Sequence, residues 1–120
     1  MCGIAGSINF SNEKISQKIV SPLIDSIKHR GPDHTGYWFS KKNNVLLINT
    51  RLSILDLTRS GNQPFISKDK RYIIVFNGEI YNFKILKNKL EEFYFKSNTD
   101  TEVVLNLFIK FGSKSLSMLE

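Results

Sequence analysis

The spacing of the β-forming runs restricts the folds open to this chain more than any other feature of its sequence. Residues 35–39 and 45–49 are rich in β-forming residues, and only a short polar segment that includes residues 41–44 separates them. A loop of this length predicts a hairpin of antiparallel strands. Because the pattern contains hairpins and not regular βαβ units, the sequence predicts the α+β class.

Two further runs predict strands. Residues 3–10 are small and apolar, which predicts a buried strand directly after Cys2. Residues 72–76 form the sequence YIIVF, and a run that is apolar on both faces is typical of a central strand. Asn77 and Gly78 follow, and they predict a tight turn at the end of that strand.

Helices are expected where apolar residues recur at helical spacing, over residues 15–28 and 82–91 and after Thr99. Ser21 and Pro22 suit the cap and first residue of a helix, so the first region is expected as one interrupted helix or two short pieces. Thr99 and Glu102 match a capping box, and Gly112 predicts the end of the helix that they start. That helix is expected to bury Val103, Val104, Leu107, Phe108 and Phe111, and a last short helix is expected from Ser113.

The composition excludes several classes of protein. The chain has 120 residues, enough for one small domain, and no apolar run approaches the roughly 20 residues that cross a bilayer. One cysteine excludes an internal disulfide, and together with two histidines it predicts no metal site. The net charge of +6 comes from scattered lysines, which predicts a solvated surface and no nucleic-acid partner.

Cys2 is the candidate nucleophile. It is the only cysteine and directly follows Met1, so removal of Met1 would leave a thiol and a free α-amine on one residue. In peptides an α-amine titrates near pH 8 (about 7.7–8.0) and a thiol near 8.5, so the amine can relay the thiol proton. N-terminal nucleophiles are activated in this way. On its own, a lone cysteine is more often a small buried apolar residue.

Two charged residues are candidates for binding a substrate. Arg51 ends a predicted strand, where a guanidinium can bind a carboxylate through two hydrogen bonds, although an exposed arginine is common there. Asp100 begins a predicted helix, where it can bind an ammonium group or simply interact favourably with the helix dipole.

The segment of Asn77, Gly78 and Glu79 is a plain turn or an oxyanion hole. The amide of an asparagine and the backbone N–H of a glycine can converge on one oxygen, and removing one such donor typically costs about 10²–10³ in rate. The loop of residues 30–33 is a surface turn or part of the same site. Together these groups predict recognition of a free α-amino acid, with a thiol that attacks its side-chain carbonyl.

The same segments carry a family resemblance. The chain resembles the N-terminal glutaminase domain of glutamine-hydrolysing asparagine synthetases, which are class II glutamine amidotransferases. The resemblance covers essentially the whole chain. The asparagine-synthetase branch of the family is favoured by Pro32, the SILDL run and Phe76. This branch also includes amidotransferases of polysaccharide and secondary metabolism. The motifs occur in the family's order: Met1-Cys2-Gly3-Ile4-Ala5-Gly6, His29-Arg30-Gly31-Pro32-Asp33, Arg51-Leu52-Ser53-Ile54-Leu55-Asp56-Leu57, Gln63-Pro64, Phe76-Asn77-Gly78-Glu79-Ile80-Tyr81-Asn82 and Thr99-Asp100-Thr101-Glu102.

The resemblance implies a fold and a set of roles. The fold is that of N-terminal nucleophile hydrolases, a four-layer αββα sandwich. Cys2 would attack glutamine and form a thioester, while Asn77 and Gly78 would hold the oxyanion. Arg51 would bind the substrate carboxylate, and Asp100 with Glu79 the substrate amine. The backbone from Arg51 through Leu52, Ser53, Ile54 and Leu55 would line the pocket.

The resemblance also implies a larger protein. Residues 1–120 would be the N-terminal part of a type 2 glutamine amidotransferase domain, truncated at its C-terminus. Ammonia would pass to a C-terminal synthetase domain that makes asparagine from aspartate and ATP. No cofactor is expected in this chain, and ATP and Mg²⁺ are expected for the synthetase domain. A homodimer and a cytoplasmic location fit the family, and no membrane partner is expected.

This sequence departs from the family in two respects. The family has a Gly-His pair shortly before the arginine, where this chain has Ile48-Asn49-Thr50. The second departure is the length, because the resemblance implies a domain that is truncated at its C-terminus. A sandwich that lacks strands leaves unpaired edges and exposed apolar surface. We therefore expect a chain of these 120 residues alone to be marginally stable or prone to aggregation.

Three alternatives stay open from the sequence. The chain could be a non-catalytic remnant that binds glutamine or a partner, or an amidotransferase with a different acceptor of ammonia. A nucleic-acid-binding module is the third alternative, and it rests on the net charge alone.

Overall fold

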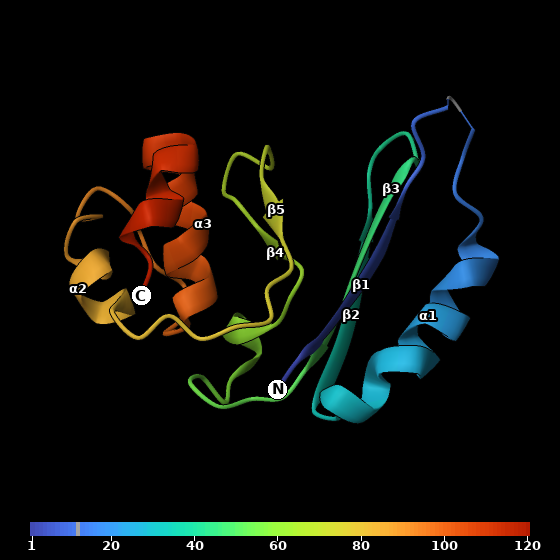
Figure 1. Cartoon of the computed structure of the whole chain (residues 1–120), viewed down its shortest axis with the longest axis horizontal. Coiled ribbons are helices and arrows are strands. Elements are labelled where there is room, and N and C mark those ends of the chain that lie inside the picture. The colour runs from blue at the N-terminus through green and yellow to red at the C-terminus, as the bar shows by residue number, and fades with distance from the viewer. Residues whose placement is uncertain (12) are drawn as a thin grey trace.

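The chain arranges its helices and strands in successive layers. The structure, a computed structural model, describes residues 1–11 and 13–120. Helix α1 (Val20–Ile27) covers one face of a three-stranded sheet, and a hairpin of two short strands lies on the other side of that sheet (Figure 1). Helices α2 (Phe83–Lys87) and α3 (Asp100–Phe111) lie beyond the hairpin. The predicted α+β class is confirmed.

The three-stranded sheet sets the position of the N-terminus. It contains β1 (Gly3–Ile8), β2 (His34–Phe39) and β3 (Val45–Arg51) in the order β1-β3-β2, with both outer strands antiparallel to β3. Gly3 lies opposite Thr50, so Cys2 precedes β1 at the end of the sheet where β3 finishes.

The predicted hairpin between β2 and β3 is confirmed. Its turn places Asn43 at a φ of 54°, a conformation that asparagine tolerates better than most residues, and Ser40 N–H donates to the Val45 carbonyl at 2.9 Å. The prediction of a buried first strand is wrong in part. Ile4 and Ile8 are 47% and 58% exposed, because only the alternate residues of β1 face α1.

Helix α1 packs on the sheet through a first apolar core. The fully buried members of this core are Leu46 and Ile48 of β3, and Leu23, Ile24 and Ile27 of the helix pack against them. The predicted interruption at Pro22 is wrong, because a 3₁₀ turn, Gln17–Ile19, leads directly into α1 and the helix continues through Pro22. Pro22 therefore occupies the third helical position, where its missing N–H is not needed.

The YIIVF run is not a central strand. Only β5 (Ile73–Ile74) is paired, with β4 (Phe65–Ile66), in a two-stranded sheet that the sequence did not predict. Further along, Phe76 N–H donates to the side chain of Gln63 and not to a strand. At its start the run packs on α3, where the ring of Tyr72 meets that of Phe108 edge to face.

Helix α3 begins and ends as its sequence predicts. Thr99 Oγ1 accepts from Glu102 N–H at 3.4 Å, and Gly112 ends the helix at a φ of 59°, which favours glycine. The Glu102 carboxylate reaches further back than in a standard capping box and accepts from Ser97 N–H at 2.7 Å. The short helix predicted from Ser113 is confirmed, and it is a 3₁₀ helix, Gly112–Met118.

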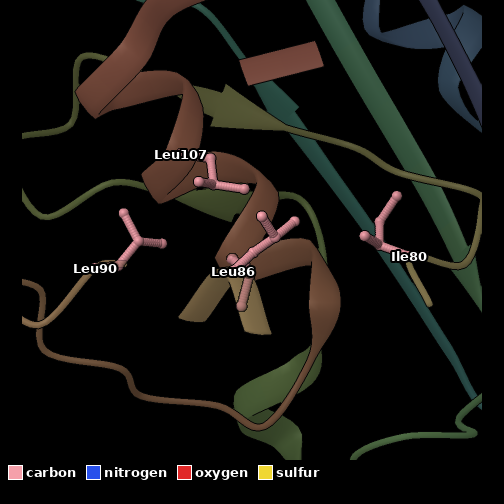
Figure 2. Close-up of a cluster of buried hydrophobic side chains, with 5 residues drawn as sticks. Ile80, Leu86, Leu90 and Leu107 are labelled. Carbon is pink, nitrogen blue, oxygen red and sulfur yellow. The ribbon is translucent and has the colours of Figure 1, made fainter. Parts of the chain in front are cut away.

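A second apolar core joins α2 to α3 and is separate from the first. Its buried members are Ile80, Leu86, Leu90, Val103 and Leu107, four of which are labelled in Figure 2. Phe108 and Phe111 are 41% and 36% exposed, so the prediction that they are buried is wrong, and Leu105 is buried instead. Helix α2 is shorter than predicted because the chain after Lys87 continues as hydrogen-bonded turns.

Candidate functional site

One cavity brings most of the predicted site residues together. It has a volume of about 300 Å³ and lies where β1 begins, β3 ends and α3 starts. That volume is at the lower end of the range for small-molecule sites. Nine predicted residues line it: Cys2, Arg51, Leu52, Ile54, Leu55, Asn77, Gly78, Glu79 and Asp100. Ser53 does not. It lines a neighbouring cavity, and its backbone N–H donates to Asp33 Oδ2 at 2.7 Å.

The Cys2 thiol is placed by backbone groups. Leu52 N–H donates to Cys2 Sγ at 3.4 Å, and the sulfur lies 3.7 Å from the Leu52 carbonyl oxygen. Arg30 Nε donates to the Cys2 carbonyl at 3.0 Å. The loop of residues 30–33 is therefore more than a surface turn, since it holds the first residues of the chain against the end of β3. Gly31 allows this approach, because an added Cβ would overlap the Thr50 carbonyl.

Arg51 is a buried cation whose hydrogen-bond acceptors are all uncharged. It is 5% exposed, and its Nη1 donates to the Thr58 carbonyl at 2.8 Å and to Asn62 Oδ1 at 2.9 Å. Its Nη2 donates to the Asp56 carbonyl. Among the described residues, ion pairs form only between Lys28 and Asp25 and between Lys110 and Glu92. Buried charges are normally paired, so this guanidinium has the chemistry to bind an anion from the cavity.

Asp100 is the complementary anion. It is also 5% exposed, and its Oδ2 accepts from Ile80 N–H at 3.0 Å. Within residues 1–11 and 13–120, it takes part in no ion pair. Its position in the first turn of α3 adds favourable interaction with the helix dipole. The cavity thus presents one buried cation and one buried anion, the pattern that a zwitterion requires.

Asn77 and Gly78 do not form the tight turn that the sequence predicts. Neither has a positive φ, and the chain bends at Gly78 and continues to Ile80. An added Cβ at Gly78 would lie 2.7 Å from the Phe76 ring, so a larger residue here would require that ring to shift. Asn77, Gly78 and Glu79 are exposed on the cavity wall, where their polar groups are open to a ligand.

Comparison with known proteins identifies the family. The whole chain, residues 1–120, matches the glutamine amidotransferase domain. The chain belongs to this family. It is 40% identical to asparagine synthetase [glutamine-hydrolyzing] 2 of Bacillus subtilis over 93% of its length, and 36% identical to asparagine synthetase [glutamine-hydrolyzing] 2 of Arabidopsis thaliana over its full length. It is also 39% identical to amidase chry2 of Gibberella zeae over 99% of its length.

This amidotransferase domain spans only a small part of those relatives. It covers 15% of the Bacillus protein, 20% of the Arabidopsis protein and 19% of the Gibberella protein. The resemblance to glutaminase domains of asparagine synthetases is confirmed.

Two residues that the sequence reasoning did not select hold the walls of the cavity. Asp56 Oδ2 accepts from Asn98 N–H at 2.9 Å, and its Oδ1 accepts from Thr58 N–H at 2.9 Å and from the Thr58 hydroxyl at 2.6 Å. These bonds lower the pKa of Asp56 from its usual 3.8 to about 2, and the bond from Asn98 N–H has the largest effect. Gln63 is the second such residue, and its side-chain amide bonds to Phe76 and Thr101. Both lie in motifs that carried the resemblance, which is the only signal that the sequence offers for them.

The residues that replace the family's Gly-His pair are packed into the sheet. Ile48, Asn49 and Thr50 are fully buried. Asn49 Nδ2 donates to the Gly3 carbonyl at 3.4 Å, and Thr50 Oγ1 donates to the Ile27 carbonyl at 3.0 Å. The side chains of Asn49 and Thr50 therefore connect β3 to β1 and to the end of α1. Nearby, burial and then the charges of Arg51 and Arg59 lower the pKa of His34.

In the part of the chain that the structure describes, no group of three or more His, Cys, Asp or Glu residues is placed to hold a metal ion. The described helices include none that is long and apolar enough to cross a membrane.

Proposed function

We propose that this domain hydrolyses L-glutamine to glutamate and ammonia, with Cys2 as the nucleophile. One observation carries the proposal. Arg51 and Asp100, a buried cation and a buried anion without ionic partners among the described residues, line the same cavity as Cys2. Arg51 would bind the substrate carboxylate and Asp100 the substrate ammonium, which leaves the side-chain amide to meet the thiol.

The reaction requires a free α-amine on Cys2, so Met1 is removed first. The amine takes the thiol proton while the sulfur attacks the amide carbon of glutamine, which gives a tetrahedral intermediate with a negatively charged oxygen. The intermediate collapses to a thioester, and the amine passes its proton to the leaving ammonia. Water then attacks the thioester, glutamate leaves, and the thiol regains a proton.

The polar groups along the cavity wall suit the developing charge. The Asn77 side-chain amide and the Gly78 backbone N–H would donate to the oxyanion, and such donors act most strongly in a water-poor site. Glu79 would assist Asp100 with the ammonium. Leu52 N–H, which already donates to Cys2 Sγ, orients the nucleophile and would help to stabilise the thiolate.

We propose further that the ammonia serves asparagine synthesis from aspartate and ATP in a C-terminal synthetase domain. The named asparagine synthetases support this, because the matched segment is a small part of each. ATP and Mg²⁺ would act in that other domain, and no step of the glutamine hydrolysis passes through them. A homodimer and a cytoplasmic location belong to the same proposal.

Amidase chry2 supports a second candidate, in which the same glutaminase domain delivers ammonia to a different acceptor. The non-catalytic alternative is less well supported, because Cys2 is retained and its sulfur lies at a cavity with two uncompensated charges.

We propose a four-layer αββα sandwich for the complete domain. The order of the layers supports it, since α1, the three-stranded sheet, the β4–β5 hairpin, and α2 with α3 follow one another across the molecule (Figure 1).

Replacement of the nucleophile tests the proposed reaction. In the full-length protein, Cys2→Ala should abolish glutaminase activity while sparing any synthesis from free ammonia, and the matched variant Ser21→Ala on exposed α1 should behave as wild type. Hydroxylamine should intercept the wild-type thioester as the hydroxamate of glutamate. Full glutaminase turnover by Cys2→Ala would show that the nucleophile is another group.

Intact-mass measurement of the active protein tests the role of the amine. The expected mass lacks Met1. An active enzyme that retains Met1 would exclude the α-amine of Cys2 as the base, because an acylated nitrogen cannot accept the proton.

A further inference from the structure

Gln63 is a buried side chain whose amide connects two walls of the cavity. Its Oε1 accepts from Phe76 N–H at 2.6 Å, and its Nε2 donates to Thr101 Oγ1 at 3.2 Å. Gln63 is 6% exposed and Thr101 is buried with it. A single amide therefore links the end of the YIIVF run to the first turn of α3.

Each of these two partners is next to a proposed site residue. Phe76 directly precedes Asn77, and Thr101 directly follows Asp100. The Phe76 N–H belongs to the planar peptide group that enters Phe76, so only the two backbone torsions of Phe76 separate this bonded group from the peptide group that leads into Asn77, and the bond narrows where the chain can place Asn77. The bond to Thr101 is made by its side-chain hydroxyl, and it connects the first turn of α3, which carries Asp100, to the same amide.

The backbone of Gln63 is itself fixed against the sheet. Gly36 of β2 lies so close to it that an added Cβ would overlap the Gln63 carbonyl oxygen. The amide thus extends from a point that the three-stranded sheet supports. Neither the run that contains Phe76 nor the start of α3 has backbone pairing with that sheet in the described residues.

We propose that Gln63 is a positioning residue, which sets the distance between the oxyanion donor Asn77 and the ammonium-binding Asp100. This inference rests on the proposed glutaminase reaction. The two bonds have separable consequences. Loss of the Phe76 bond affects a group that acts mainly in the transition state and so lowers kcat, whereas loss of the Thr101 bond affects ground-state binding and so raises KM.

Three variants of the full-length protein test the proposal. Gln63→Met keeps the length of the side chain but removes both bonds, and kcat for glutamine should fall by about 10- to 100-fold, consistent with a displacement of about 1 Å. Thr101→Val keeps the Phe76 bond, so KM should rise by about three- to tenfold while kcat stays within about twofold. Gln17→Met replaces the other glutamine, which is exposed, and should leave both constants unchanged.

Coupling to Asn77 separates positioning from general stability. If Gln63 acts through Asn77, Gln63→Met should cost less than about threefold in kcat when Asn77 is already alanine. A purely structural role of Gln63 predicts a lowered melting temperature and an unchanged kcat per folded molecule. It also predicts that the effects of the Gln63 and Asn77 substitutions are independent of each other. Should Gln63→Met not fold, Gln63→Asn gives the same comparison, because its amide is one methylene too short to reach both partners.

The outcomes distinguish this inference from the reaction on which it rests. If wild-type protein hydrolyses glutamine and Cys2→Ala does not, the glutaminase function holds. A kcat within about twofold of wild type for folded Gln63→Met, or for Gln63→Asn where Met does not fold, then overturns the positioning role alone. If wild-type protein releases no glutamate from glutamine, the proposed function itself is overturned, and the positioning role with it.

Discussion

Replacing the carboxylate of Asp100 with an amide should separate substrate binding from folding. Asp100 is buried, and one of its oxygens is already used by Ile80 N–H. Asp100 lines the cavity, where its other oxygen would accept from a substrate ammonium. Asp100→Asn keeps the shape of the side chain and an acceptor for Ile80, and it removes only the charge.

The size of the effect follows from the burial of the pair. A charge-assisted hydrogen bond in a buried site contributes about 2–3 kcal/mol, and each 1.4 kcal/mol is a factor of ten. We therefore expect kcat/KM for glutamine to fall by about 30- to 150-fold, mostly through KM. Stability should change by less than about 1 kcal/mol, because the lost interaction with the α3 dipole offsets the relief of a buried charge.

A substrate without the amine makes the assay specific. Glutaramate has the carboxylate and amide of glutamine but no α-amine, so Asp100→Asn should turn it over about as fast as wild type does. Asp25→Asn is the matched control, since Asp25 on α1 is exposed and pairs with Lys28, the residue that follows the helix. Equal losses for glutamine and glutaramate, or a KM for glutamine within threefold of wild type, would refute the assignment of Asp100 to the ammonium.

Two further predictions concern stability. Because the folded pKa of Asp56 is depressed to about 2 from its usual 3.8, its contribution is present above about pH 4 and is lost as the pH falls towards 2. Asp56→Asn should therefore lower the free energy of unfolding by about 2 kcal/mol at pH 7, as measured by urea titration. The difference from wild type should disappear between pH 4 and pH 2. A difference that stays constant with pH would show that the charge of Asp56 is not its source. Leu107→Ala, at a fully buried position of the second core, should cost about 2–5 kcal/mol by the same titrations, whereas Ile85→Ala at an exposed position should cost under about 0.5 kcal/mol. A small loss for Leu107→Ala would mean that α2 and α3 do not depend on that core.

Local signals predicted most of the elements, and tertiary contacts account for the errors. The β2–β3 hairpin and the ends of α3 follow from turn and capping residues, which act within a few positions of the chain. Strand β4 has two residues, too few for a periodic pattern. The YIIVF run, which contains β5, is not the predicted central strand because it packs on α3 and bonds to Gln63. Helical spacing alone could not show that Phe108 stays 41% exposed while its ring meets Tyr72.

The candidate site was predictable for a different reason. Cys2, Arg51 and Asp100 have side chains whose charge or reactivity suggests a role wherever they lie, and the motif order placed them in one family. Gln63 and Asp56 act by bonding to backbone groups that are distant in the sequence, 13 and 42 positions away in the cases of Phe76 and Asn98. Residue type carries no such information, so these roles required the structure. Ser53 shows the converse, since its place in a motif did not bring it to the cavity.

The presence of two separate apolar cores has a consequence for how the domain responds to its substrate. Arg51 and Cys2 belong to the part built around the first core, and Asp100 belongs to the part built around the second. A molecule that contacts the guanidinium at one end and the carboxylate at the other fastens the two parts together, so glutamine would act as a removable cross-link. Saturation with substrate should then suppress hydrogen exchange along the line where the parts meet more than inside either one.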